Sequence, residues 1–268
     1  MKNTQLLLIN DMCGYGKVAL SAMLPVLSHM GYRIHNLPTA LVSDTLNYPK
    51  FYIHDTTEYV RQSLAIWEEL GFEFDAISTG FIVTEEETRI ISDFCHRRAQ
   101  KGTKVFVDPI MGDNGKLYAG VPESTIGLMR HLLECADYAV PNYTEACLLT
   151  DTLLQNRSRP MRPAPLWTPC ASWVPSRWSL RAPWSMARTR LSVTTMWRGV
   201  LHDPLRADPG VLPGTGDTFS AVLMGRVMSG WTLQRATADA MRVVAELIER
   251  NAAQEDKSAG CPSRPAWM

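Results

Sequence analysis

The segment LPGTGDTFS at residues 212–220 decides how the rest of the sequence is interpreted. It leads into a long apolar run, residues 221–228, that is typical of a helix. Two glycines directly before a helix allow backbone N–H groups to converge on an anion, and the helix dipole adds positive potential there. Asp217 is better suited to accept a proton from an attacking nucleophile than to bind a phosphate. The alternative is an ordinary glycine-rich turn in which Asp217 caps the helix.

The size and composition of the chain fit a globular protein. The 268 residues suffice for one large α/β domain or two small ones, and 46% of them are hydrophobic, which permits a sizeable core.

The formal net charge is zero, so we expect neither a nucleic-acid partner nor a membrane surface. The apolar run at residues 6–9 is too short for a signal peptide or a membrane span. The six cysteines have no CxxC or metal-ligand spacing, which is typical of reduced thiols in a cytoplasmic protein.

Strands and helices alternate along much of the chain. The hydrophobic pattern predicts buried strands at residues 5–9, 32–37, 75–79, 104–107 and 136–140, and helices at residues 18–30, 55–71, 84–102, 122–135, 214–230 and 232–250, with a further helix starting at Asn142. Such alternation is typical of βαβ units, so we expect an α/β fold with a mainly parallel sheet. In these sheets, ligands bind outside the carboxyl ends of the strands.

Local signals predict the limits of several elements. Residues 10–17 are expected to form a glycine-containing loop after the first strand, and Pro38 is expected to end the second strand. The patterns DTTE at residues 55–58 and TEEE at residues 84–87 each predict a capping box at the start of a helix.

The alternation breaks down in residues 152–200. This stretch has no Asp, Glu or Lys, but it holds eight Arg, six Pro and five of the eight Trp of the chain. The prolines would interrupt regular elements where two or three strands of the sheet are expected. Our hypothesis is that residues 152–205, roughly, are translated out of frame, and that residues 259–268 are an irregular tail of similar character. Sequencing of the source DNA tests this, because an uninterrupted frame supported by independent reads would contradict it.

Three segments after predicted strands carry groups that suit a ring-shaped substrate. NDMCGYGK, residues 10–17, offers backbone and polar side chains together, although its glycines are also explained by a simple βα turn. Ser43 and Thr45 can hydrogen-bond a heterocycle or only cap a turn. Phe81 can stack on an aromatic substrate or be an ordinary apolar residue.

Two further segments carry carboxylates suited to a magnesium-bound phosphate. Asp108 begins DPIMGD at the end of a predicted strand, where it can orient such a phosphate through water. Asn142 and Glu145 have the spacing of a capping box, and they can also hold water around a magnesium ion. Magnesium keeps several of its waters, so an indirect site is chemically reasonable.

The order and spacing of GYG, DPxMGD, PNxxE and GTGD resemble the pyridoxal kinase branch of the ribokinase-like superfamily. The resemblance covers residues 1–151 and about 211–258 of a single domain, residues 1–268. It implies the ribokinase-like three-layer α/β fold, with a mainly parallel central sheet flanked by helices. It also implies a cytoplasmic homodimer that uses ATP and Mg²⁺ to phosphorylate the 5′-hydroxymethyl group of pyridoxal, pyridoxine or pyridoxamine.

The resemblance also implies roles for individual residues. Asp217 would be the catalytic base, in an anion hole formed by Gly214, Thr215 and Gly216. The magnesium–phosphate region would be served by Asp108, Asp113, Asn142 and Glu145, of which Asp108 and Glu145 would hold the metal through water. The vitamin pocket would be lined by Asp11, Tyr15, Ser43, Thr45 and Phe81.

The chain departs from the family pattern at two places near the predicted pocket. Many pyridoxal kinases carry a serine where Asp11 stands, and the SDT segment at residues 43–45 lacks the histidine found there in relatives. The nucleotide-covering strands should lie in residues 152–205, where nothing matches, so no residue is assigned there. Two alternatives remain. One is a hydroxymethylpyrimidine kinase, a family with the pattern GSDSxGG at the first loop. The other is a non-catalytic relic that lacks the elements that hold the nucleotide.

Overall fold

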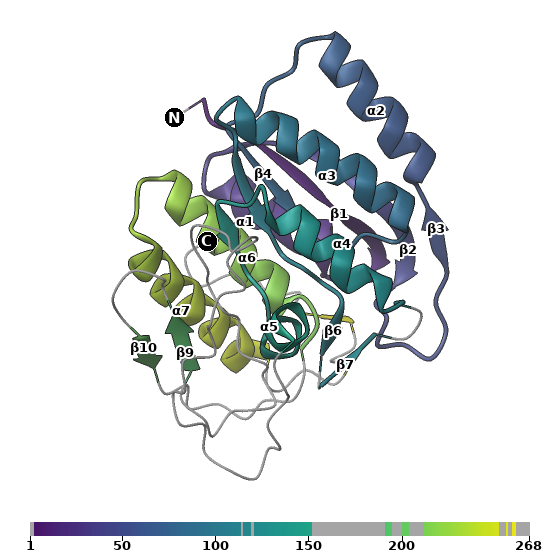
Figure 1. Cartoon of the computed structure of the whole chain (residues 1–268). Coiled ribbons are helices and arrows are strands. Elements are labelled where there is room, and N and C mark those ends of the chain that lie inside the picture. Colours follow the sequence, from purple (N-terminus) through teal and green to yellow (C-terminus); the bar gives the residue numbers. More distant parts are fainter. Residues whose placement is uncertain are drawn as a thin grey trace.

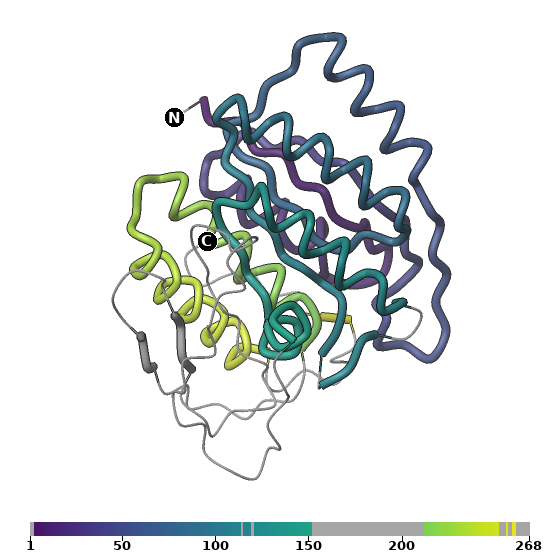
Figure 2. Tube along the Cα trace, in the orientation of Figure 1, coloured from purple at the N-terminus to yellow at the C-terminus, as the bar shows by residue number. Residues whose placement is uncertain are grey.

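A six-stranded sheet forms the centre of the computed structural model (Figure 1). The structure describes residues 3–113, 115–118, 121–151, 191–194, 200–203, 212–251, 256 and 259–260. The strand order is β3-β2-β1-β4-β5-β8, and every pairing is parallel except that of β3 with β2. The strands are β1 Gln5–Tyr15, β2 Arg33–Asp44, β3 Ile53–Asp55, β4 Ala76–Thr79, β5 Lys104–Val107 and β8 Tyr138–Ala139. The N-terminal strand β1 lies inside the sheet, between β2 and β4 (Figure 2).

Helices cover both faces of the sheet and give the predicted three layers. One core contains Leu6 and Leu8 of β1, and the other contains Leu7 and Ile9, because successive side chains of a strand point to opposite faces. The first core is closed by α1 (Ala19–His29), α6 (Thr215–Met228) and α7 (Leu233–Asn251). The second is closed by α2 (Thr57–Glu69), α3 (Glu85–Gln100), α4 (Ser124–Leu133) and α5 (Tyr143–Thr150). None of the helices within the described ranges is long and apolar enough to cross a membrane.

Strands β1 and β2 are longer than predicted. Residues 10–15 were expected in a loop, but they continue β1 and pair with β2 as far as the Tyr15–Asp44 pair. Pro38 does not end β2. It lies opposite Asn10, where the register shifts by one residue between the two strands. A bulge tolerates proline because the regular ladder of hydrogen bonds is interrupted there.

Several short strands were not predicted. The edge strand β3 pairs antiparallel with β2, and β6 (Gly112–Asp113) forms a small hairpin with β7 (Lys116–Leu117). Within the anomalous segment, β9 (Leu191–Thr194) and β10 (Val200–Asp203) pair with each other and not with the central sheet. The remainder of residues 152–205 lies outside the described residues, so the frame-shift hypothesis stays a prediction.

Only one of the two predicted capping boxes has the expected N-cap. Thr84 accepts a hydrogen bond from the N–H of Glu87 at 3.0 Å, as predicted for α3. At α2 the prediction was wrong in detail, because the N-cap residue is Thr56. Asp55 instead accepts from the N–H of Thr57, two residues on. The carboxylate therefore forms a local turn at the end of β3, which satisfies one N–H group in the first turn of the helix.

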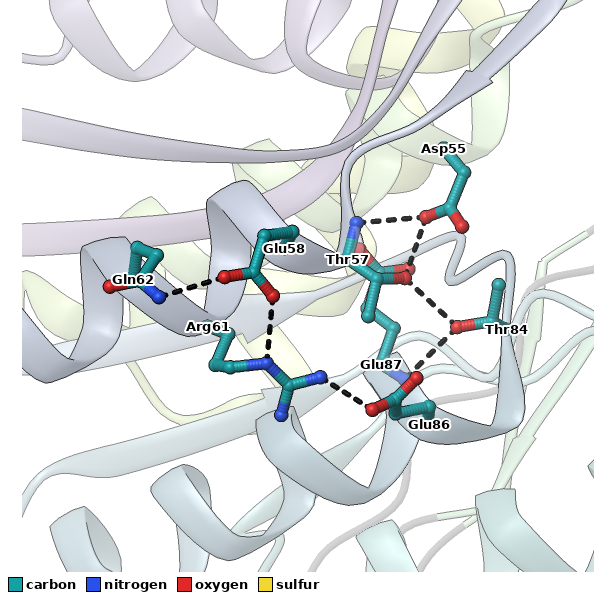
Figure 3. Close-up of polar contacts among 8 residues, drawn as sticks. All are labelled: Asp55, Thr57, Glu58, Arg61, Gln62, Thr84, Glu86 and Glu87. Atoms are coloured by element: carbon teal, nitrogen blue, oxygen red, sulfur yellow. Dashed lines mark hydrogen bonds and ion pairs between the residues drawn. The ribbon is translucent and has the colours of Figure 1, made fainter.

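A polar network joins the first turns of α2 and α3 (Figure 3). The Thr57 hydroxyl donates to the Asp55 carboxylate at 2.6 Å, so the Thr84 hydroxyl must be the donor in its 3.0 Å contact with Thr57. Beside these threonines, Glu87 is fully buried, and its carboxyl accepts from the N–H of Val83 at 3.1 Å. Its second oxygen has no partner among the described residues. Burial raises the pKa of Glu87 to about 8, and the charge of Asp55 acts in the same direction against the hydrogen bond from Val83.

We expect Glu87→Gln to stabilise the protein at pH 8 on the order of 1 kcal/mol, and to have less effect at pH 5. The folded state disfavours the Glu87 carboxylate, so the wild type loses stability as pH rises from about 4.5, the ordinary pKa of Glu, through about 8. Glutamine keeps an oxygen for Val83 but does not ionise. Urea unfolding at both pH values measures the difference, and an equal change at the two values would contradict the prediction.

Candidate active site

The amino end of α6 packs against the loop that precedes α1. Gly214 has a φ of +83°, in the left-handed region that favours glycine, and a Cβ there would collide with the carbonyl oxygen of Lys17. Lys17 also forms a β-bridge with Gly260, and its N–H donates to the carbonyl oxygen of Ala259 at 2.9 Å. Glycine at position 214 is therefore required for α6 to begin at the carboxyl edge of the sheet.

The first turn of α6 presents backbone donors. The hydroxyl of Thr215 donates back to the carbonyl oxygen of Leu212, and that of Thr218 to Gly214. Within the described residues, no side chain caps this helix, and the N–H groups of Thr215, Gly216 and Asp217 have no acceptor. N–H groups left without an acceptor at a helix amino end can bind an anion. The anion hole at Gly214, Thr215 and Gly216 stays a prediction that this geometry allows.

A second carboxyl group, that of Asp11, lies near Asp217. Asp11 is on β1 at the bulge and only 8% of it is exposed. Burial and, to a smaller extent, the negative charge of Asp217 raise the pKa of Asp11 to about 7, against a smaller lowering by the hydrogen bond with its backbone N–H. Around neutral pH, Asp11 therefore exists partly in the protonated form, which can donate a hydrogen bond where the carboxylate can only accept.

Asn10 connects Asp11 to the loop that carries Phe81. Its side-chain oxygen accepts from the N–H of Asp11 at 3.0 Å and from the N–H of Phe81 at 2.8 Å. The hydroxyl of Thr39 donates to the carbonyl oxygen of Phe81 at 2.6 Å. The sequence analysis assigned no role to Asn10 or Thr39. The available signal was that both are polar residues in segments predicted to follow buried strands, and both are buried in the structure.

Asp108 ties the end of β5 to α6. It is 4% exposed, and its carboxylate accepts a 2.9 Å hydrogen bond from the hydroxyl of Ser220, which lies one turn beyond Asp217 on the helix. The two residues are 112 positions apart in the chain. This contact brings two of the predicted motifs together.

Asn142 and Glu145 form the capping box of α5, which the sequence analysis gave as one of two interpretations. Glu145 is fully buried, and its carboxylate accepts from the N–H of Asn142 at 2.7 Å and from that of Met111 at 3.3 Å. The side chain of Asn142 donates to the carbonyl oxygen of Gly112 at 2.8 Å. These bonds hold the β6–β7 hairpin, and with it Asp113, against the start of α5.

The other predicted pocket residues, Tyr15, Ser43 and Thr45, have contacts of their own. Tyr15 is 61% exposed and packs edge-on against Tyr48, with ring centroids 5.8 Å apart. Ser43 is exposed, and its hydroxyl accepts from the N–H of Tyr52 at 2.8 Å. Thr45 is buried, and its methyl group lies against Gly16. Asn10 thus joins Asp11 to Phe81, and Ser220 joins Asp108 to the helix that carries Asp217, whereas Tyr15, Ser43 and Thr45 contact other groups.

Comparisons with known proteins test the predicted fold and family. No protein-family model matches the chain. The pyridoxine/pyridoxal/pyridoxamine kinase of Bordetella bronchiseptica is 25% identical over 255 residues, which cover 92% of this chain and 87% of the relative. The crystal structure of a candidate phosphomethylpyrimidine kinase from Bacteroides thetaiotaomicron has a TM-score of 0.88 and 29% identity, covering 98% of this chain and 92% of that one. Another crystal form of that protein was determined with pyridoxal.

The pyridoxal kinase of Lactobacillus plantarum has a TM-score of 0.81 and 26% identity, covering 96% of this chain and 92% of that one. These similarities extend over nearly the whole chain. They confirm the predicted three-layer fold and the predicted resemblance to pyridoxal kinases.

We expect Gly80→Ala to destabilise the protein by about 1–3 kcal/mol, because a Cβ at Gly80 would collide with the side-chain amide of Asn10. Displacement of that amide also releases the N–H groups of Asp11 and Phe81. Gly127→Ala in α4 is the matched control: no atom lies within 4 Å of its added methyl group, and alanine favours a helix by up to about 1 kcal/mol. Urea unfolding compares the two variants, and equal midpoints would contradict the role assigned to Asn10.

Proposed function

We propose that the chain is a kinase of the pyridoxal kinase branch of the ribokinase-like superfamily and transfers the γ-phosphoryl group of ATP to the 5′-hydroxymethyl group of a B6 vitamer. The observation that carries this proposal is the amino end of α6, where Asp217 belongs to the same first turn as backbone N–H groups that have no acceptor among the described residues. One group can stabilise charge on a transferred phosphoryl while the other accepts a proton from the attacking hydroxyl. The homology to pyridoxal kinases supports the choice of substrate.

The proposed reaction assigns separate roles to the two carboxyl groups near α6. Asp217 accepts the proton of the vitamer hydroxyl as the hydroxyl oxygen attacks the γ-phosphorus, while the bond from that phosphorus to the β-phosphate oxygen breaks and ADP leaves. The N–H groups of Thr215, Gly216 and Asp217 bind the phosphoryl oxygens. Asp11, with a pKa of about 7, faces the ring of the vitamer and exchanges hydrogen bonds with its polar atoms. Phe81, which Asn10 holds beside Asp11, stacks on the same ring. Tyr15, Ser43 and Thr45 line the outer part of the pocket in this proposal.

The magnesium–phosphate region is proposed at Asp108, Asp113, Asn142 and Glu145. Their oxygen donors fit a hard cation such as Mg²⁺. Asp108 and Glu145 are buried and already accept hydrogen bonds, which fits the predicted contact through water better than direct ligation. When bound, Mg²⁺ would neutralise charge on the phosphates of ATP.

Asp217→Asn should lower kcat by about 10²- to 10⁴-fold and leave the affinity for ATP unchanged, because the amide cannot accept the proton while the N–H groups remain. The assay is ATP-dependent phosphorylation of pyridoxal, pyridoxine and pyridoxamine by the purified chain, with ATP affinity measured separately by calorimetry. Hydroxymethylpyrimidine is included as a substrate because of the Bacteroides relative. The exposed carboxylate Asp93→Asn on α3 is the control and should retain full activity.

Full activity of Asp217→Asn would refute the role of the base. A preference for hydroxymethylpyrimidine would favour the alternative substrate. A wild-type chain that turns over none of the four compounds, and whose thermal unfolding does not respond to ATP, would be the non-catalytic relic.

We further propose a cytoplasmic homodimer formed through the β3 edge of the sheet. Large apolar side chains are exposed on β2 and on the segment that leads into β3, namely Leu41, Leu46, Phe51 and Tyr52. A free strand edge beside exposed apolar residues is a suitable surface for a second copy of the chain.

Light scattering after gel filtration should give twice the 30.0 kDa mass of the chain. Phe51→Asp should give the monomer, because a buried aspartate at the interface would lack a partner. Leu70→Asp, at the exposed end of α2, is the control and should remain dimeric. A monomeric wild type would contradict the proposal.

A further inference from the structure

Two histidines and a glutamate come together where the carboxyl ends of α3 and α4 lie side by side. His96 belongs to α3, His131 to the last turn of α4, and Glu134 is the residue that ends α4. Each offers one ligand atom, and these atoms all lie within 4.8 Å of one another. The two imidazole rings stack, with centroids 5.0 Å apart and planes 22° apart. None of these residues takes part in the proposed phosphoryl transfer.

The hydrogen bonds around the two rings prepare them for a cation. Nδ1 of His96 lies 2.9 Å from the carbonyl oxygen of Ser92, which can only accept, so in the neutral ring Nδ1 carries the hydrogen and Nε2 keeps a lone pair. Nδ1 of His131 lies 3.0 Å from a carboxylate oxygen of Glu134. A divalent cation can replace the proton between these two groups, so that nitrogen and oxygen become ligands together.

The arginines that adjoin the two histidines in sequence are paired with carboxylates. The nearest arginines in sequence are engaged elsewhere: Arg97 contacts Glu68 at 3.1 Å, and Arg130 contacts Asp151 at 2.7 Å. The carboxyl ends of two helices also contribute negative potential at this point. The side chains of His131 and Glu134 are about half exposed, so a cation can reach them from solvent and both can adjust toward it.

The cluster is remote from the candidate active site. In a βαβ unit the helix runs antiparallel to the strands, so the carboxyl ends of α3 and α4 lie at the amino edge of the sheet. Asp11, Asp108 and Asp217 lie at the opposite, carboxyl edge. A metal at the cluster can therefore be tested independently of the kinase reaction.

We propose that His96, His131 and Glu134 form a binding site for a divalent transition-metal ion of the zinc class. Two imidazole nitrogens and a carboxylate oxygen are the ligands that Zn²⁺ shares with Cu²⁺ and Ni²⁺, whereas Mg²⁺ prefers oxygen ligands alone. Water completes the coordination on the exposed side. A bound ion would cross-link α3 to α4 and stabilise the folded chain.

The test is calorimetric titration of the full chain with ZnCl₂, without nucleotide, in parallel with thermal unfolding. Zn²⁺ should raise the melting temperature of the wild type, because it binds the folded state. His131→Gln should weaken the affinity at this site by at least about 10- to 100-fold, and the double variant with His96→Gln should lose the site. His29→Gln, at an exposed histidine in the last turn of α1, is the matched control and should bind as the wild type does.

Electron paramagnetic resonance of the Cu²⁺-loaded chain supplies a second readout, because two imidazole ligands give nitrogen hyperfine splitting that the double variant should lack. Melting temperatures measured without metal show whether the variants are folded. Equal Zn²⁺ affinity in the wild type and the double variant would overturn the proposal, as would a Cu²⁺ spectrum without nitrogen coupling. Neither outcome bears on the phosphorylation assay, so the metal site and the kinase activity are tested independently of each other.

Discussion

The side-chain amide of Asn10 is the interaction on which the geometry of the candidate site depends. One oxygen accepts the N–H of Asp11 on its own strand and the N–H of Phe81 from the loop after β4. A buried amide oxygen with two good donors is stable, whereas the same N–H groups left unpaired would each cost about 1–3 kcal/mol. Because Asn10 fills the space beside Gly80, that residue cannot carry a side chain. The distance between the two sides of the proposed vitamin pocket is therefore set by one side chain.

Buried polar contacts of the same kind bring the other motifs to the carboxyl edge of the sheet. Ser220 on α6 reaches Asp108 after β5, and Glu145 on α5 reaches the backbone of Met111. Each buried carboxylate accepts hydrogen bonds, which offsets the cost of removing it from water. Asp11 differs, since burial and the nearby charge of Asp217 favour its protonated form. The site thus combines carboxylates fixed by hydrogen bonds with one carboxyl group that titrates near neutral pH.

The sequence predicted the parts of the fold that local patterns determine. The alternation of the five parallel strands with helices, the cap of α3 at Thr84 and the start of α6 at Gly214 were predicted correctly, whereas the short strands outside this pattern were not. The extension of β1 to Tyr15 was not, because glycines in that stretch favour a loop unless a neighbouring strand pairs with it. The prediction that Pro38 ends β2 was wrong for a similar reason, because the bulge that accommodates this proline arises only when β1 and β2 pair. The role of Asn10 depends on a residue 71 positions away, and no local pattern could reveal it.

Among the described residues, the helix that carries Asp217 is held by contacts with the first recognisable part of the chain. This helix is placed by Gly214 against Lys17 and by Ser220 against Asp108, and residues of α6 share a core with β1 and α1. All of these partners precede residue 151. The geometry of the proposed base and anion hole therefore follows from residues that match the pyridoxal kinase pattern. The nucleotide-covering elements expected in residues 152–205 are a separate requirement, so the placement of the proposed base and the covering of the nucleotide rest on different parts of the sequence.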